Sequence, residues 1–231
     1  MIFRQLIETD SSTYTYLLGC QDTRQAILID PVLETVERDL AALQELELTL
    51  AMAVETHIHA DHVTAASRLR SLTGCRVAVP GAANVACADI AVEEGAPLEA
   101  GTVLLRPLFT PGHTDDHHSY LVTGAGGARV FTGDALLIDG CGRTDFQNGD
   151  AATLYRSVHD KIFTLPQDCL VFPAHDYEGR RVSTVAQERA RNPRLGDGIA
   201  LDAFVEIMAA LDLPYPKRID VAVPANRNCG A

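Results

Sequence analysis

A hexapeptide rich in histidine is the part of the sequence best suited to metal chemistry. Residues 57–62 read His-Ile-His-Ala-Asp-His and directly follow an apolar run that is predicted to be a strand. Side chains two apart at the end of a strand point the same way, so His57 and His59 face one side. Asp61 and His62 open the next element and can turn back toward them. Imidazole nitrogens and a carboxylate that converge in this way bind metal ions.

Three later segments repeat this arrangement of an apolar strand followed by a loop with one ligand-type residue. LFTPGHT contains His113, VFTGDAL contains Asp134 and VFPAHDY contains His175. The ends of neighbouring strands can meet at one rim of a sheet. Each of these residues alone would be ordinary, because a lone histidine is more often a core or surface residue than a ligand. Together with the hexapeptide they predict a metal centre.

The strands that must position these residues are predicted from β-branched, aromatic and aliphatic runs bounded by turn residues. Residues 13–18 and 26–29 are predicted to form a hairpin that ends at Asp30-Pro31. The TGAGGA segment is predicted to be a hairpin turn rather than a phosphate loop, since no helical pattern follows it. Further strands are predicted at 50–54, 76–79, 103–109, 119–122, 129–132 and 169–172.

Helices are expected between and after these strands, at 35–46, 61–74, 151–163, 180–191 and 201–211. In the first, apolar Val36, Leu40 and Leu43 recur at helical spacing between charged residues. The second would start directly at the hexapeptide and stop at Gly74. Strands alternating with helices in this way predict a layered α/β architecture.

Composition and charge narrow the class of protein. The 231 residues are 47% hydrophobic and 22% charged, which excludes a disordered chain and a disulfide miniprotein. The formal net charge of −12 argues against nucleic acid as a partner, since a phosphate backbone requires a basic face. No apolar stretch approaches the roughly 18 residues of a membrane span, and no signal-peptide pattern is present, so we expect a cytoplasmic protein without membrane association. The six cysteines lack C-x-x-C spacing and are predicted to be reduced, mostly buried thiols.

The motifs together resemble the metallo-β-lactamase superfamily over about residues 10–190. HxHxDH is followed by a histidine after Pro-Gly, by Gly-Asp and by a late histidine. The resemblance implies an α/β fold, the αββα sandwich of two mixed β-sheets flanked by helices, in a single domain over residues 1–231 with a short C-terminal extension. Within the superfamily, GCGRTDFQ, PAHDY and VPAN resemble segments of the persulfide dioxygenases, the sulfur dioxygenases of mitochondria and bacteria.

The family resemblance implies one iron(II) per chain, held by His57, His113 and Asp134. Two histidines and one carboxylate on one face suit this metal, because they leave positions open for oxygen and substrate. Hydrogen bonds from the surrounding catalytic residues would tune the centre. These residues are His59, Asp61, His62 and His175.

The implied reaction is the oxidation of glutathione persulfide by O2 to sulfite and glutathione. Arg143 and Tyr177 are identified by the resemblance as glutathione contacts, and Arg143 could grip a carboxylate with two parallel hydrogen bonds. The alternative for Arg143 is an ion pair with Asp145 that braces its loop. After His113 the sequence is more charged than the family pattern, and His117 and His118 are expected to be loop or supporting residues rather than ligands. A homodimer is the family expectation.

Two other functions fit part of the pattern. All the ligand-type residues of a binuclear zinc or mixed-metal site are present, so a glyoxalase II-type hydrolase of glutathione thioesters, with Asp134 bridging the metals, is chemically available. The GCGRTDFQ stretch and the short C-terminal region favour the dioxygenase instead. A noncatalytic persulfide or metal sensor would bind without turnover, but no DNA-binding helix pair or basic patch supports it.

Overall fold

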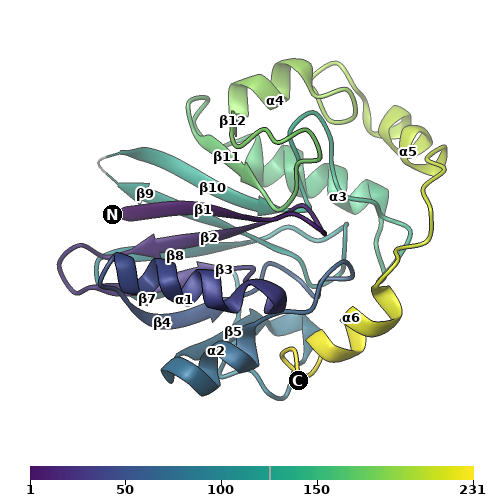
Figure 1. The fold of residues 1–231 in the computed structure, drawn as a ribbon. Coiled ribbons are helices and arrows are strands. Elements are labelled where there is room, and N and C mark those ends of the chain that lie inside the picture. The colour runs from purple at the N-terminus through teal and green to yellow at the C-terminus, as the bar shows by residue number, and fades with distance from the viewer. Residues whose placement is uncertain (125) are drawn as a thin grey trace. The chain divides into compact units, whose positions relative to one another are not determined.

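The computed structural model describes residues 1–124 and 126–231, which divide into two compact units. The first comprises residues 1–105 together with 215–231, and the second comprises residues 106–214. Each unit has strands, helices and a hydrophobic core of its own (Figure 1). The C-terminal residues therefore belong with the N-terminal part of the chain.

A six-stranded mixed sheet forms the centre of the first unit. Its strand order is β1-β2-β3-β4-β5-β6, antiparallel from β1 to β3 and parallel from β3 to β6. The predicted hairpin is confirmed as β2–β3, whereas β1 and β6 were not predicted. The strands are β1 (Ile2–Glu8), β2 (Thr13–Gly19), β3 (Gln25–Ile29), β4 (Thr49–Val54), β5 (Arg76–Pro80) and β6 (Ile90–Val92).

Two helices cover one face of this sheet. The apolar side of α1 (Val36–Glu45) contributes Leu43, and α2 (Ala66–Thr73) contributes Leu69, to a core shared with alternate strand residues such as Leu28 and Val77. Gly74 ends α2 in the left-handed conformation, as the sequence predicts. The remaining elements of the unit are short 3-10 turns at Leu33–Thr35 and Gly81–Ala83, β7 (Leu98–Ala100), the start of β8 (Val103–Phe109) and α6 (Ile219–Asn226).

The second predicted helix begins at Ala66 rather than at Asp61. Residues 61–65 pair instead with the chain after β3: Leu33 N donates to Val63 O at 2.9 Å, and Ala65 N donates to Pro31 O at 2.8 Å. These backbone groups are therefore satisfied outside a helix. The correction matters for the hexapeptide, because all of it lies in a loop that is tied to a neighbouring segment.

The sheet of the second unit is built from β8–β12. The strand order is β12-β11-β10-β9-β8-β7, with β10 and β11 parallel and the other pairs antiparallel. The antiparallel pairing of β9 with β10 confirms the hairpin predicted at TGAGGA, although Ala125 itself lies outside the described residues. These strands are β9 (His118–Gly124), β10 (Gly127–Gly133), β11 (Leu170–Pro173) and β12 (Ser183–Thr184).

Three helices contribute to the core of the second unit, and the last of them packs against the first. They are α3 (Ala151–Ser157), which continues as a π-helical turn at Val158–Ile162, α4 (Val185–Arg191) and α5 (Leu201–Ala209). The prediction of a helix from residue 180 is wrong at its start, because Thr184 caps α4 by accepting a hydrogen bond from Gln187 N. Within the part of the chain that the structure describes, no helix has the length and apolar character needed to cross a bilayer.

The prediction for the cysteines is only partly right. Cys87 and Cys229 form a disulfide, although no sequence spacing pointed to this pair. Because 142 residues separate the two, only the fold brings them together. The prediction of buried thiols is confirmed for Cys20, Cys75, Cys141 and Cys169.

Candidate active site

The hexapeptide occupies the loop between β4 and α2 in the first unit, and its three histidines are buried. Asp30, at the end of β3, anchors this loop from within the protein. Its carboxylate accepts hydrogen bonds from Thr56 N at 2.7 Å and Thr56 Oγ1 at 2.9 Å, and lies 3.1 Å from His59 Nε2. One buried carboxylate thus holds the start and the middle of the loop.

His57 has a defined orientation because of this anchor. Its Nδ1 lies 2.9 Å from Thr56 Oγ1, whose own hydrogen is donated to Asp30. The hydroxyl oxygen must therefore accept a hydrogen bond from His57 Nδ1. In the neutral ring this leaves the lone pair on Nε2, the state required of a metal ligand.

His59 and His62 each use one ring nitrogen and leave the other without a hydrogen-bond partner. His59 Nε2 faces Asp30, and His62 Nδ1 lies 2.9 Å from Asp61 Oδ2. His59 Nδ1 and His62 Nε2 are buried and have no hydrogen-bond partner among the described residues, although His59 Nδ1 lies 3.8 Å from Asp61 Oδ1. Burial lowers the pKa of His62, whereas for His59 the surrounding Asp30, Asp61 and Glu55 outweigh burial and raise the pKa.

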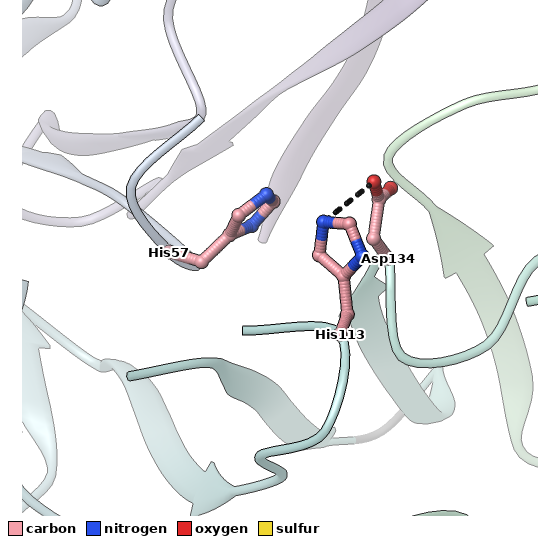
Figure 2. Close-up of side chains that lie close together, drawn as sticks. All are labelled: His57, His113 and Asp134. Carbon is pink, nitrogen blue, oxygen red and sulfur yellow. Dashed lines mark ion pairs between the residues drawn. The ribbon is translucent and has the colours of Figure 1, made fainter. Parts of the chain in front are cut away.

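The second unit places His113 and Asp134 side by side. His113 Nε2 lies 3.3 Å from Asp134 Oδ2, the pair joined by a dashed line in Figure 2, which also draws His57. His113 Nδ1 lies 2.7 Å from the carbonyl oxygen of Arg143, which can only accept. The proton of the neutral ring is thus on Nδ1, and Nε2 carries the lone pair. A backbone carbonyl in the GCGRTDFQ stretch therefore fixes the ring orientation of this predicted ligand.

Asp134 has two further neighbours. Its backbone N–H donates to His117 Nε2 at 3.1 Å, and its Oδ1 lies 3.5 Å from His175 Nε2. His117 is itself held by Thr110 Oγ1, 3.0 Å from its Nδ1. His117 therefore supports the backbone of Asp134, which agrees with its expected supporting role. His118 lies outside this set, with its Nδ1 2.9 Å from Asp116 O.

Two glycines are required by the close packing around His113. A Cβ on Gly112 would lie 2.3 Å from Leu154 N, and Gly112 has a φ of +133°. A Cβ on Gly142 would lie 2.7 Å from both His113 Nδ1 and Asp134 O. The second glycine in Gly-Cys-Gly thus allows the chain to approach two predicted ligand residues at once. This is a structural reason for part of the motif.

Arg143 and Tyr177 occupy different settings. Arg143 donates to both carboxylate oxygens of Asp145, at 2.6 and 2.7 Å, and to Pro214 O at 2.8 Å. The hydrogen bonds from Arg143 lower the pKa of Asp145. This ion pair is the one expected if Arg143 braces its loop instead of binding substrate. The side chain of Tyr177 is exposed, and its ring lies parallel to that of His175 with centroids 6.1 Å apart.

Sequence reasoning missed the residues that hold the predicted ligands. Asp30, Thr56 and the carbonyl of Arg143 orient His57 and His113, and none of them was singled out for this role. A signal existed for Asp30, since it ends an apolar strand just as Asp134 does. For the backbone carbonyl of Arg143 no such signal exists, because every residue type has a carbonyl group.

Comparisons with known proteins identify the family. The sequence profile of the Metallo-beta-lactamase superfamily matches residues 9–175. The chain belongs to this superfamily. Over all its 231 residues it is 52% identical to human "Persulfide dioxygenase ETHE1, mitochondrial" and covers 89% of that protein. The crystal structure of ETHE1 from Myxococcus xanthus matches with a TM-score of 0.95 and 53% identity, and each chain covers 100% of the other.

These matches confirm the family predicted from the motifs, the persulfide dioxygenases, and the fold class of two mixed β-sheets with flanking helices. A "Probable hydroxyacylglutathione hydrolase" of Schizosaccharomyces pombe is 31% identical over 166 residues, which are 71% of this chain and 64% of that protein. The likeness to this hydrolase is thus weaker and shorter than the likeness to the dioxygenases.

Proposed function

We propose that the protein is a persulfide dioxygenase that uses one iron(II) per chain to oxidise glutathione persulfide with O2 to sulfite and glutathione. The observation that carries this proposal is the full-length match to the human persulfide dioxygenase at 52% identity. His57, His113 and Asp134, each of which offers one ligand atom, would hold the iron. Two imidazoles and one carboxylate are the donor set of ferrous enzymes that activate oxygen.

The side chains fit this metal. The hydrogen bonds of His57 and His113 leave Nε2 of each ring with its lone pair, and Asp134 Oδ1 is buried without a hydrogen-bond partner among the described residues. Iron(II) held by these residues would supply open coordination positions for O2 and for a sulfur ligand. The work of the chain is to orient the ligands before the metal arrives.

Four further residues would assist the reaction from around the metal, by hydrogen bonds to the reactants and to the ligands. The three imidazoles among them are buried, and hydrogen bonds in a buried site are stronger than they would be in solvent. His175 would also steady Asp134, to which it is already close. The four residues are His59, Asp61, His62 and His175.

Arg143 and Tyr177 would bind the glutathione moiety. Glutathione carries two carboxylates, and an acidic protein needs a local cation to hold them. To bind a carboxylate with two hydrogen bonds, Arg143 would exchange its contact with the exposed Asp145 for one with the substrate. The exposed ring of Tyr177 would supply a contact surface beside His175.

Metal analysis coupled to oxygen uptake tests this function. We expect protein purified without added metal to contain close to one iron per chain, and to consume O2 and form sulfite when glutathione persulfide is added. Two zinc ions per chain with hydrolysis of a glutathione thioester, and no oxygen uptake, would establish the hydrolase instead. Iron binding without turnover would point to a sensor.

The cellular setting is part of the proposal. We place the reaction in the cytoplasm, and we expect a homodimer, which sedimentation analysis would test. The human relative is named as mitochondrial. A disulfide such as Cys87–Cys229 is uncommon in reducing compartments, so the redox state of this pair in cells bears directly on the location.

A further inference from the structure

Asn226, in the last turn of α6, contacts the loop that carries the hexapeptide. Its Oδ1 accepts a hydrogen bond from Thr64 N at 2.8 Å. Its Nδ2 donates to the carbonyl oxygens of His59 and His62, both at 2.9 Å. The side chain is buried. One amide thus satisfies three backbone groups of the loop, two of which belong to ligand-type histidines.

The residues after Asn226 continue this contact. Ser67 N, at the start of α2, donates to Cys229 O at 2.9 Å. Gly230 lies so close to the loop that a Cβ there would be 2.0 Å from Thr64 O. The final turn of the chain, residues 226–230, therefore lies directly against residues 64–67. We call residues 226–230 the C-terminal clasp.

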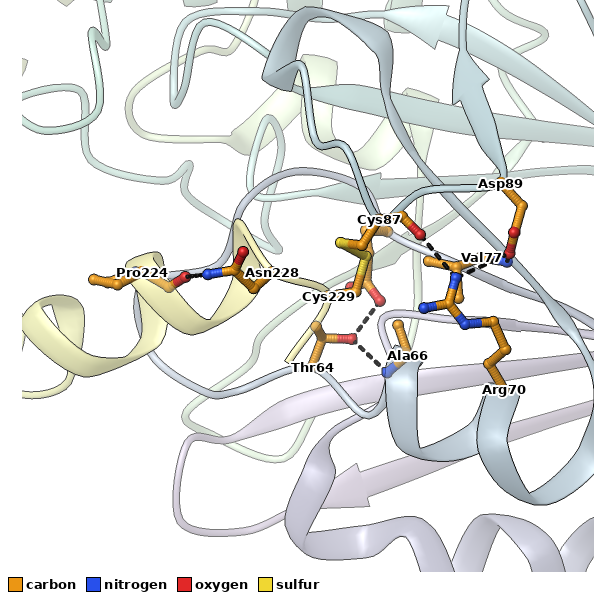
Figure 3. The surroundings of a disulfide bond; sticks show 10 residues. Thr64, Ala66, Arg70, Val77, Cys87, Asp89, Pro224, Asn228 and Cys229 are labelled. Carbon is orange, nitrogen blue, oxygen red and sulfur yellow. Dashed lines mark hydrogen bonds and ion pairs between the residues drawn. A yellow bond between two sulfur atoms is a disulfide. The ribbon is translucent and has the colours of Figure 1, made fainter. Parts of the chain in front are cut away.

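The disulfide ties the clasp to the first sheet. Cys229 is bonded to Cys87, between β5 and β6, and Figure 3 shows Thr64 and Ala66 next to this bond. On the other side, Cys87 O accepts a hydrogen bond from Arg70 of α2 at 2.8 Å. The bond thus joins the end of the chain to the elements that flank the loop.

We propose that Asn226 is a positioning residue for the metal-binding loop, and that the Cys87–Cys229 disulfide keeps it in place. This inference rests on the proposed metal site and adds a residue to its support. Asn226 fixes the carbonyls of His59 and His62, and so limits the backbone freedom of the loop. A loop held in its binding conformation loses less conformational entropy when the metal binds.

The redox state of the pair then affects the metal site. Reduction by a dithiol breaks the Sγ–Sγ bond, forms thiols at Cys87 and Cys229, and converts the dithiol to its own disulfide. The clasp keeps its hydrogen bonds after reduction but loses its covalent tether. Reduction should therefore weaken metal binding less than removal of the Asn226 side chain does.

Cobalt(II) is the probe for the test, because its visible absorption reports both affinity and ligand geometry. We expect Asn226→Ala to weaken Co(II) binding by about tenfold, the lower end of the effect of residues that orient metal ligands. Asn226→Asp keeps the acceptor for Thr64 N but places a carboxylate against two carbonyls, and it should weaken binding as well. If Asn226→Ala does not fold, the Co(II) affinity of Asn226→Asp decides whether Asn226 positions the loop.

Asn228→Ala is the matched control. Asn228 is an exposed asparagine in the same turn whose Nδ2 donates to Pro224 O rather than to the loop. We expect this variant to bind Co(II) like the wild type. For the disulfide, wild-type protein reduced with dithiothreitol and freed of it by gel filtration should bind Co(II) more weakly than the oxidised protein. Cys87→Ser should match the reduced wild type and not respond to the treatment.

The outcomes separate this inference from the function on which it rests. A wild-type protein that binds no metal contradicts the proposed function. A wild type that binds Co(II), together with an Asn226→Ala variant of lower melting temperature but unchanged Co(II) affinity and spectrum, overturns the positioning role alone. Equal affinity of the oxidised and reduced wild type would remove the role of the disulfide.

Discussion

The two units supply ligand-type residues in contrasting ways. In the first unit they lie within one short loop, in which the three histidines are buried and Asp61 is 34% exposed, and Asp30 and Asn226 hold the loop from two sides. In the second unit His113, Asp134 and His175 come from three separate loops, and the side chains of His113 and Asp134 are 12% and 13% exposed. The positions of the residues in the first unit thus depend on hydrogen bonds to a single loop. Those in the second unit depend on the strands that bring three loops together.

This difference in exposure suggests that the ligand-type residues of the two units have different tasks. Partial exposure suits residues that must meet incoming substrates, because a fully enclosed ligand would have to move. Burial suits residues that must keep one orientation through many turnovers. Substitutions in the two regions should therefore differ in the balance between lost metal and lost rate.

The largest effect is expected for His113→Ala. Loss of this imidazole removes a proposed ligand, so iron and oxygen uptake should disappear together, with activity reduced by more than about 100-fold. His59→Ala is the partner experiment, and it should keep most of its iron while turning over more slowly. Iron content and oxygen uptake of both variants give the answer. Equal iron loss in both would show that the ligand assignment is wrong.

The next largest effect is expected for Asp30→Ala, which acts through His57, the proposed ligand of the first unit. It leaves Thr56 N buried without its acceptor and frees the hydroxyl that orients His57. We expect iron affinity to fall by about 10- to 100-fold. Asp30→Asn keeps one oxygen acceptor and should recover part of the loss. Chelator competition measures both variants, and unchanged affinity in Asp30→Ala would contradict the anchoring role.

The same contrast explains which parts of the site could be predicted. The hexapeptide is visible in sequence because its members are neighbours, and His113, Asp134 and His175 are visible because each follows an apolar strand. Of the residues that support them, only Asp30 also follows an apolar strand, and the others are not visible in this way. The Arg143 carbonyl has no sequence signature, and Asn226 reaches His59 from the far end of the chain.

The fold shows a similar division. Strands with continuous β-branched or aliphatic runs were found within one or two residues of their ends, β8 (Val103–Phe109) among them. Short edge strands such as β12 and the start of α2 were missed, because long-range pairing decides them. Pro31 and Leu33 bind residues 63–65, and this tertiary contact overrides the helical pattern of the segment. The Cys87–Cys229 bond was missed for the same reason.

Arg143→Ala tests the substrate side of the second unit. If the guanidinium binds a glutathione carboxylate, its loss should cost about 2 kcal/mol, or about thirtyfold in kcat/KM, with iron retained. The loss should shrink for a persulfide that lacks these carboxylates. Asp145→Ala is the control for the bracing role, since it removes the partner that Arg143 has in this structure. Equal impairment toward both substrates, or loss of iron, would favour bracing.

The smallest effect is expected for Arg180→Ala, which tests whether the loops of the second unit need an added brace. Arg180 connects Asp176, next to His175, with Asp139 in the loop after Asp134, at 3.0 and 2.6 Å. The Arg180 side chain is 35% exposed, so solvent weakens these ion pairs. Asp176 also keeps the N–H groups of Glu178 and residue 180 as donors. We therefore expect a loss of about 1 kcal/mol, or about fivefold in kcat/KM. Arg180→Lys should recover part of it, and the rate and iron content of the two variants measure the effect. A loss as large as that of Asp30→Ala would mean that the second unit relies on hydrogen-bonded bracing as much as the first.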